Sequence, residues 1–308
     1  MKQIVSFASR KDCKQFSKSQ YIEQFNKLEF DGENYMKIDT TIVDSYLDSR
    51  DVKNYESLWL YNFETKQGQK SIFQLPPESA TKREAVADIK KEIILSCRNF
   101  TPCNSKIWDI LFDDWREFID NTTLDLIVGY PEPNDALVKQ APDGKYHMIF
   151  DLLCWEKYVG KVCLSEAIQN LLTHELFHVM IENRFSDIEL KETQGIYMEQ
   201  LDAITFNEGF AHLVSYNQQE IDKVLWNGEK LTEVYNASVM KMKNAIQEKN
   251  TEEQAQYIYE SNHGNYYDKY AAMCGMIYLG REWQQGGNER LKELFFEGYN
   301  GFATKSIE

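Results

Sequence analysis

The chain has 308 residues, of which 43% are hydrophobic and 13% aromatic, so it is long and apolar enough to bury a sizeable core. Its formal net charge of −15 at pH 7 argues against nucleic acid and acidic lipid surfaces as partners, because both carry negative charge. No apolar run reaches the length of a membrane span, and the first residues lack the apolar core of a signal peptide. We therefore expect a protein that binds neither nucleic acid nor membrane.

The cysteines show no C-x-x-C spacing, which argues against a metal knuckle. They are expected to be free thiols in a reducing compartment, at Cys13, Cys97, Cys103, Cys154, Cys163 and Cys274. Together with the absence of a signal peptide, this predicts a cytoplasmic protein.

Residues 1–77 carry the weakest signals and are expected to form an N-terminal α/β region of unknown role. Partial periodicity predicts a strand, two helices and two further strands at Met1–Ser9, Gln15–Leu28, Thr41–Leu47, Leu58–Phe63 and Ser71–Leu75. Pro76 and Pro77 then interrupt the chain, so a domain boundary is placed after residue 77 and a second domain at 78–308.

The second domain is expected to begin with a helical scaffold at 78–120, in which one helix starts near Glu78 and another spans Ser105–Ile119. A small sheet at 123–152 follows, with strands at Thr123–Gly129 and Lys145–Leu152. The turn-rich segment Pro131–Gly144 joins these two strands.

The most informative stretch reads T-H-E-L-F-H and lies in a helix for which Ser165 is a plausible N-cap. His174 and His178 are four residues apart, so both imidazoles stand on one face of that helix. H-E-x-x-H is typical of metalloproteases, in which the two histidines bind zinc and the glutamate, here Glu175, is the base for a metal-bound water. A lone buried histidine would be interpreted as a core residue, but the pair favours zinc.

A catalytic zinc needs a third protein ligand, and Glu208 is the candidate, in a second predicted helix at Leu190–Tyr216. Gly209 costs about 1 kcal/mol in a helix interior, so it indicates a close approach of two helices around the metal. The alternative is a solvated Glu208 beside a glycine that only serves packing. His212 lies four residues after Glu208. It is either an outer hydrogen-bonding partner or a ligand itself.

H-E-L-F-H followed by N-E-G-F-A resembles the gluzincin metallopeptidases, the thermolysin and aminopeptidase N group. The resemblance implies one zinc per chain bound by His174, His178 and Glu208, with Glu175 as general base and proton shuttle. Twenty-nine residues separate His178 from Glu208, more than in aminopeptidases, so an insertion around 184–195 is expected to loop out. No G-A-M-E-N-like string is present. Aminopeptidase and endopeptidase activity therefore both stay open.

The resemblance also implies a donor that stabilises the oxyanion, a histidine or tyrosine downstream of the ligand glutamate. His263 and Tyr267 are the candidates, with Tyr266 as an alternative, and a core role is the default for any one tyrosine. In such enzymes a strand before the zinc helix aligns the substrate, so Tyr146–Asp151 is the candidate for this substrate-binding edge strand. The alternative is that Tyr146–Asp151 is an ordinary core strand. His147, within this strand, is expected to be structural.

Further helices are predicted in the C-terminal part of the chain. They span Leu231–Lys249, a segment that starts with a capping box at Thr251, residues 271–283 with a stop at Gly286 and Gly287, and Asn288–Phe296.

The sequence thus predicts a mainly α-helical α+β protein, with a zincin-like domain, zinc helices at 165–216, C-terminal helices at 231–298 and a small mixed sheet. The expected activity is zinc-dependent hydrolysis of peptide bonds in a peptide or protein substrate, and the oligomeric state is left open. Two alternatives remain. One is a structural module whose zinc has four protein ligands, including His212. The other is a metal-free helical protein that binds other proteins.

Overall fold

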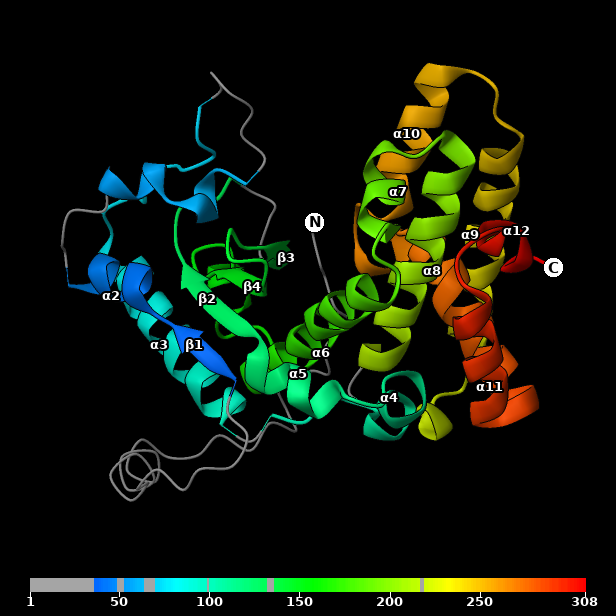
Figure 1. Ribbon diagram of the computed structural model, residues 1–308, viewed down its shortest axis with the longest axis horizontal. Helices are drawn as coiled ribbons and strands as arrows, with labels where there is room; N and C mark the ends of the chain where they lie inside the picture. Colours follow the sequence, from blue (N-terminus) through cyan, green and yellow to red (C-terminus); the bar gives the residue numbers. More distant parts are fainter. Residues whose placement is uncertain (1–35, 49–52, 64–69, 99, 132–135, 217–218) are drawn as a thin grey trace.

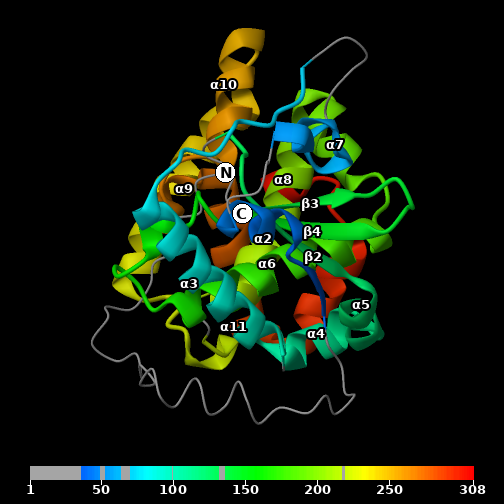
Figure 2. The same ribbon diagram turned by 90° about the vertical axis from the view of Figure 1, so that its left-hand side faces the viewer.

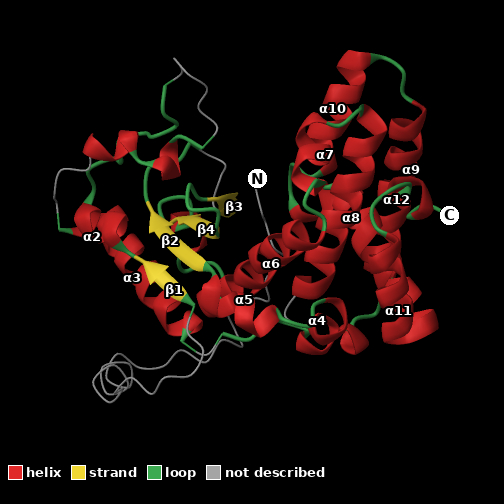
Figure 3. Ribbon diagram, in the orientation of Figure 1, coloured by secondary structure: helices red, strands yellow, loops and turns green. Residues whose placement is uncertain are grey.

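The computed structural model describes residues 36–48, 53–63, 70–98, 100–131, 136–216 and 219–308. In Figure 1 a half that contains the sheet lies on the left and a half made of helices lies on the right, with helix α6 (Leu164–Arg184) between them. Figure 3 shows that the strands of the described residues all belong to the first half. The strand predicted at Met1–Ser9 and the helix predicted at Gln15–Leu28 lie outside the described residues.

The sheet has four strands in the order β1-β2-β4-β3. These are β1 (Lys37–Asp39), β2 (Thr123–Ile127), β3 (Ala136–Gln140) and β4 (Tyr146–Asp151). β1 and β4 both pair parallel with β2, whereas β3 pairs antiparallel with β4 and forms an edge. Every residue of β2 is buried, as expected for a strand covered on both faces. The mainly helical chain with its small mixed sheet confirms the predicted α+β class.

Helices α2 (Thr41–Leu47) and α3 (Ala80–Cys97) lie beside the sheet. α3 begins after Ser79, whose hydroxyl accepts a hydrogen bond from the Lys82 amide and so satisfies one free N–H of the first turn. Its buried face includes Ile89 and Ile93, and the helix contacts α6. In Figure 2, seen from the side of the sheet, α3 crosses in front of α6.

Four sequence-based expectations differ from the structure of this half. The helix expected at Ser105–Ile119 is two helices, α4 (Ser105–Leu111) and α5 (Trp115–Asn121), because the backbone at Phe112 is extended. The turn-rich segment before β4 contains the strand β3. The strand expected at Leu58–Phe63 is a short 3₁₀ turn, and no strand forms at Ser71–Leu75.

The second half is built from helices that follow α6. They are α7 (Ile188–Gln194), α8 (Tyr197–Ser215), α9 (Glu229–Gln247), α10 (Thr251–Ser261), α11 (Tyr270–Glu297) and α12 (Phe302–Lys305). The expected single helix at Leu190–Tyr216 is therefore α7 and α8, and the expected insertion is a helix rather than a loop. α10 is capped by the Asn250 side chain and not by a Thr251 capping box. α11 is broken at Gly287, where φ is +65°, which agrees with the predicted stop.

Helices α8 and α11 approach each other closely at two glycines. A Cβ atom at Gly209 of α8 would lie 2.8 Å from the Gly275 Cα of α11, and one at Gly275 would lie 2.2 Å from the Thr205 carbonyl oxygen. Only glycine fits such an approach. The expected close approach at Gly209 is thus present, but its partner is α11 rather than the other metal-binding helix.

A large hydrophobic core of the described residues includes side chains from Met36 to Phe302, and a smaller separate cluster in the helical half includes Leu201, Met242 and Tyr270. β1 precedes the boundary predicted at residue 77 and pairs with β2 beyond it, so both sides of that boundary share a sheet and a core. None of the helices in the described ranges is long and apolar enough to cross a membrane.

The cysteines agree only in part with the expectation of free thiols. Cys97, Cys103, Cys154 and Cys274 are free. Cys163 is disulfide-bonded, so the prediction is wrong at that position, and Cys13 lies outside the described residues. The cysteines therefore no longer argue for a reducing compartment, and the cytoplasmic location stays a prediction.

Candidate metal centre

Helix α6 carries the H-E-x-x-H motif through the middle of the molecule. It begins after Cys163, two residues before the predicted cap, and all its residues from Asn170 to Ile181 are buried. A helix buried on every side is not a surface helix with one apolar stripe. It contacts the sheet through β3 and β4 and the helical half through α8. His174, Glu175 and His178 are therefore held between two packed layers.

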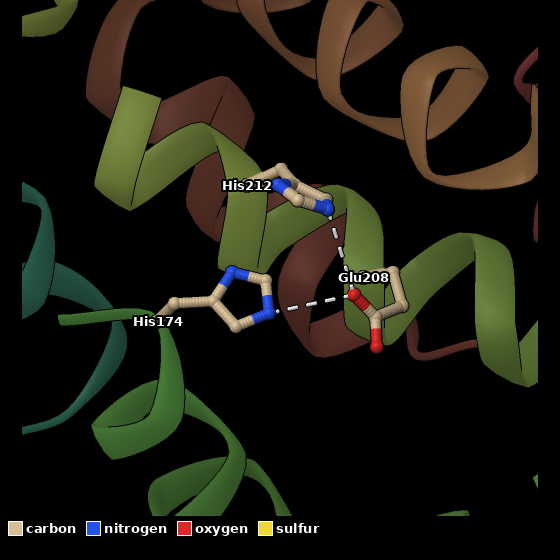
Figure 4. A group of neighbouring side chains, drawn as sticks. All are labelled: His174, Glu208 and His212. Carbon is tan, nitrogen blue, oxygen red and sulfur yellow. Dashed lines mark ion pairs between the residues drawn. The ribbon is translucent and has the colours of Figure 1, made fainter. Parts of the chain in front are cut away.

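Helix α8 crosses α6 and brings Glu208 and His212 to the same place. Every residue from Ala203 to Ser215 is buried. The rings of Phe177 on α6 and Phe210 on α8 stack with centroids 6.0 Å apart. These phenylalanines are neighbours of His178 and Gly209 in sequence, so their contact fixes the two motifs against each other. Figure 4 shows His174 extending from α6 toward Glu208 and His212 on α8.

The possible ligand atoms lie at distances that suit one metal ion. His174 Nε2 lies 3.0 Å from His178 Nε2 and 3.5 Å from Glu208 Oε2. The remaining contacts of the carboxylate are 3.6 Å from Oε1 to His178 Nε2 and 3.7 Å from Oε2 to His212 Nε2. Two ligands of a tetrahedral zinc, each 2.0–2.1 Å from the metal, lie roughly 3.3 Å from each other. The observed separations bracket that value.

These contacts define two overlapping sets of three possible metal ligands. One set is the predicted His174, His178 and Glu208. The other is His174, Glu208 and His212, whose ligand atoms all lie within 4.8 Å of one another. His174 and Glu208 belong to both sets, so the choice lies between His178 and His212.

Two buried polar atoms at this place have no hydrogen-bond partner among the described residues. They are Glu208 Oε2 and His212 Nε2, which face each other across the 3.7 Å separation. A buried carboxylate oxygen without a hydrogen bond costs about 1–3 kcal/mol or more, and a cation between it and the imidazoles would remove that cost. The residues therefore fit a divalent metal ion.

The protonation states also suit a cation. Burial lowers the pKa of His174 to about 4 and holds that of His212 well below its usual value, so both imidazoles are neutral near pH 7. Burial alone would raise the pKa of Glu208, but the neighbouring His178 and His174 outweigh burial and hold it well below its usual range. Neutral imidazoles and an ionised carboxylate are the forms that bind metal.

A hydrogen-bonded chain fixes the tautomer of His178. Its Nδ1 lies 2.9 Å from Asn207 Oδ1, and the Asn207 amide nitrogen donates to Glu192 Oε1 at 2.7 Å. An amide oxygen only accepts, so Nδ1 of His178 carries a proton, and in the neutral imidazole the lone pair then lies on Nε2, on the side of His174 and Glu208. Outer partners of this kind normally orient metal-binding histidines.

The predicted base, Glu175, is almost fully buried and follows His174 in α6. It does not belong to the group of ligand atoms around Glu208. Its role as the base therefore stays a prediction.

The expected oxyanion donors make no hydrogen bond to a candidate ligand among the described residues, although the Glu208 charge is one of those that act on the pKa of His263. His263 stacks on Tyr259, and the Tyr267 hydroxyl lies 3.2 Å from that of Tyr216. Tyr266 does contact the centre, with its ring edge-on to His212, but its hydroxyl donates to Met276 Sδ. Among the described residues, neither His263 nor Tyr267 makes a hydrogen bond or ring contact with a ligand residue.

His147 and strand β4 occupy structural positions. His147 Nδ1 lies 2.5 Å from Asp125 Oδ2 on the neighbouring strand, and Trp59 packs edge-on against its ring. The structural role expected of His147 agrees with these contacts. β4 lies between β2 and β3, so it is not the edge that was considered for substrate binding. The edge on that side of the sheet is β3.

Three residues near the centre were not singled out from the sequence. Asn207 precedes the ligand glutamate and could have been found as the N of N-E-G-F-A. Glu192 lies in the presumed insertion, and burial raises its pKa to about 8. Lys269 is fully buried, and its ammonium group contributes to the lowered pKa values of His174 and His212. No local pattern marks the last two, because their contacts with the centre are long-range.

Comparisons of the chain with protein-family models, with curated proteins and with solved structures gave no match.

Proposed function

We propose that the protein is a zinc-dependent hydrolase of peptide bonds, of a gluzincin-like kind with one metal ion per chain. The observation that carries the proposal is the meeting of His174, His178 and Glu208 from two crossing helices at separations of 3.0 to 3.6 Å. The buried, unpartnered Glu208 Oε2 adds the need for a cation.

Each residue has a distinct part in the proposed reaction. His174, His178 and Glu208 would hold the ion, which when bound polarises a carbonyl and lowers the pKa of a water. Glu175 would take a proton from that water and pass it to the leaving amine. The His178 side chain is 11% exposed, against 2–5% for those of His174, Glu208 and His212, so water and substrate would reach the centre from that side.

The edge strand β3 is the proposed substrate-aligning element in place of β4. It packs against α6, and its outer side is not paired by another strand of the described residues. An extended peptide gains main-chain hydrogen bonds by adding to such an edge, and pockets beside it select side chains. The proposed substrate is therefore an extended peptide or an unfolded protein segment.

Hydrolysis of a random peptide library, followed by mass spectrometry, tests this function. The wild-type protein should cleave peptides, lose activity after chelation and regain it with zinc. Glu175→Gln should keep the metal and lose nearly all turnover, because the proton acceptor is removed while the ligands stay. Turnover by Glu175→Gln at the wild-type rate would remove Glu175 from the base role.

A second function is favoured by a specific observation, the buried and unpartnered His212 Nε2 facing Glu208. If His212 is a fourth ligand, the ion has no exchangeable position and serves to cross-link α6 and α8, as in structural zinc sites. Such a protein would act by binding a partner rather than by hydrolysis.

A hydroxamate inhibitor separates the two functions, because it needs an open coordination position. The hydrolase should bind it tightly in its zinc form, and His212→Ala should bind it at least as well. A closed structural centre would bind it only in the His212→Ala variant.

A further inference from the structure

The residues that lengthen the spacing between His178 and Glu208 form helix α7, which lies against α8. α7 is held at both ends of the segment. The Tyr299 hydroxyl donates to Asp187 at its start, and the Gln200 side chain of α8 donates to the Glu192 backbone carbonyl near its end. The helix therefore presents Glu192 at a defined position beside α8.

From that position the Glu192 side chain controls one amide group. Its Oε1 accepts a hydrogen bond from Asn207 Nδ2 at 2.7 Å, which leaves Asn207 Oδ1 facing His178 Nδ1 at 2.9 Å. An amide can turn over and exchange its oxygen and nitrogen. Above its pKa of about 8 the Glu192 carboxylate is ionised and has no proton to donate, so it only accepts, and the amide nitrogen must face it. The reversed orientation would place an N–H against His178 Nδ1 and move the imidazole proton to Nε2, the metal-binding atom.

We propose that Glu192 is a positioning residue for the metal centre, which acts through Asn207 to keep the His178 proton on Nδ1 and its Nε2 free for the ion. The inference rests on the proposed use of His178 as a ligand. It gives the inserted helix α7 a function, because the insertion supplies the group that fixes the His178 tautomer.

Three variants of the full-length protein test the proposal. Glu192→Leu removes the acceptor and fills the space. Glu192→Gln provides a group that both donates and accepts, so either amide orientation is allowed. Glu189→Gln is the matched control, since Glu189 lies one turn earlier in α7 and pairs with Lys139 instead of Asn207.

The first readout is zinc affinity at pH 9, where Glu192 is ionised, measured by competition with a chromogenic chelator. Loss of an outer partner of a metal-binding histidine typically weakens affinity by 10–100-fold. We expect about a tenfold loss in Glu192→Leu, a smaller loss in Glu192→Gln and wild-type affinity in Glu189→Gln.

The second readout is the His178 tautomer in the metal-free protein, from ¹⁵N NMR of labelled histidine, assigned by comparison with His178→Gln. Spectra are recorded at pH 9, above the Glu192 pKa of about 8. The wild type should show the Nδ1–H form alone, and Glu192→Leu and Glu192→Gln should show both forms. A purely structural role for Glu192 would not change the tautomer.

The outcomes separate this inference from the proposed function. A wild-type protein that binds no zinc would refute the metal centre, while its tautomer would still decide the role of Glu192. Unchanged zinc affinity and a single Nδ1–H form in Glu192→Leu would overturn the inference. If that variant does not fold, a single Nδ1–H form in Glu192→Gln would overturn it equally.

Discussion

Burial of His174 makes the metal-free protein sensitive to acid in a way that can be calculated. The pKa of His174 is lowered to about 4 by burial, whereas an unfolded histidine titrates at 6.5. Between these values the unfolded chain binds a proton that the folded protein does not, so the free energy of unfolding falls as the pH falls. The difference in pKa corresponds to about 3 kcal/mol of stability, most of which is lost between pH 7.5 and pH 4.5.

Substitution of His174 by Gln isolates this contribution, because glutamine has a similar polarity and does not titrate. Urea unfolding of the metal-free protein at several pH values gives the free energy of unfolding for wild type and variant. Groups remote from His174 titrate alike in both proteins and cancel in the difference, whereas Glu208 and His212 interact with His174 and also respond to the substitution. We expect the wild type to lose roughly 2 kcal/mol more than His174→Gln between pH 7.5 and 4.5. Equal losses would refute the conclusion that His174 is held neutral in a dry site.

Three further predictions follow from the same contacts. Zinc at 100 times its dissociation constant should raise the free energy of unfolding of the wild type by about 2.7 kcal/mol, measured by urea titration, and should leave Glu208→Ala unchanged. Gly275→Ala places a Cβ 2.2 Å from the Thr205 carbonyl and should destabilise the protein by about 2 kcal/mol in the same assay, despite the better helix propensity of alanine. Unchanged stability would mean that α8 and α11 separate freely. Tyr267→Phe should keep wild-type peptidase activity, since its hydroxyl pairs with Tyr216 and not with the centre.

The sequence predicted the helices that carry the ligands because their signal is local. The spacing of His174 and His178, and of Glu208 and His212, depends only on the helical repeat, so each pair was placed on one face without knowledge of the fold. The helix that packs against Gly209 could not be predicted in this way. A glycine indicates a close approach, but nothing near it in the sequence identifies Gly275 on α11 as the element that approaches.

The errors in secondary structure occurred where local signals conflict with packing. β3 is a five-residue strand that follows a turn-rich segment, and its pairing with β4 decides its conformation. The helix expected at Ser105–Ile119 has continuous apolar periodicity, yet it breaks at Phe112, whose buried ring packs edge-on against Phe177 and Phe295. Tertiary contacts override propensity at such positions.

The outer part of the metal centre could not be predicted from local patterns at all. Glu192 is fifteen residues from Asn207 and fourteen from His178 in the sequence, and only the folding of α7 onto α8 brings these side chains together. Lys269 likewise acts through its position at the start of α11. Short motifs identify the candidate ligands, whereas the groups around them are placed by the fold.

Metal content is the most direct test of the central claim, that α6 and α8 together build a zinc site. Wild type, His178→Ala, His212→Ala and Glu208→Ala are dialysed side by side and analysed by elemental mass spectrometry. We predict about one zinc per chain in the wild type and in His212→Ala, and none in His178→Ala or Glu208→Ala. Zinc retained in His178→Ala but lost in His212→Ala would replace the predicted ligand set with His174, Glu208 and His212. A wild-type protein without metal, or equal zinc in all four proteins, would contradict the metal centre itself.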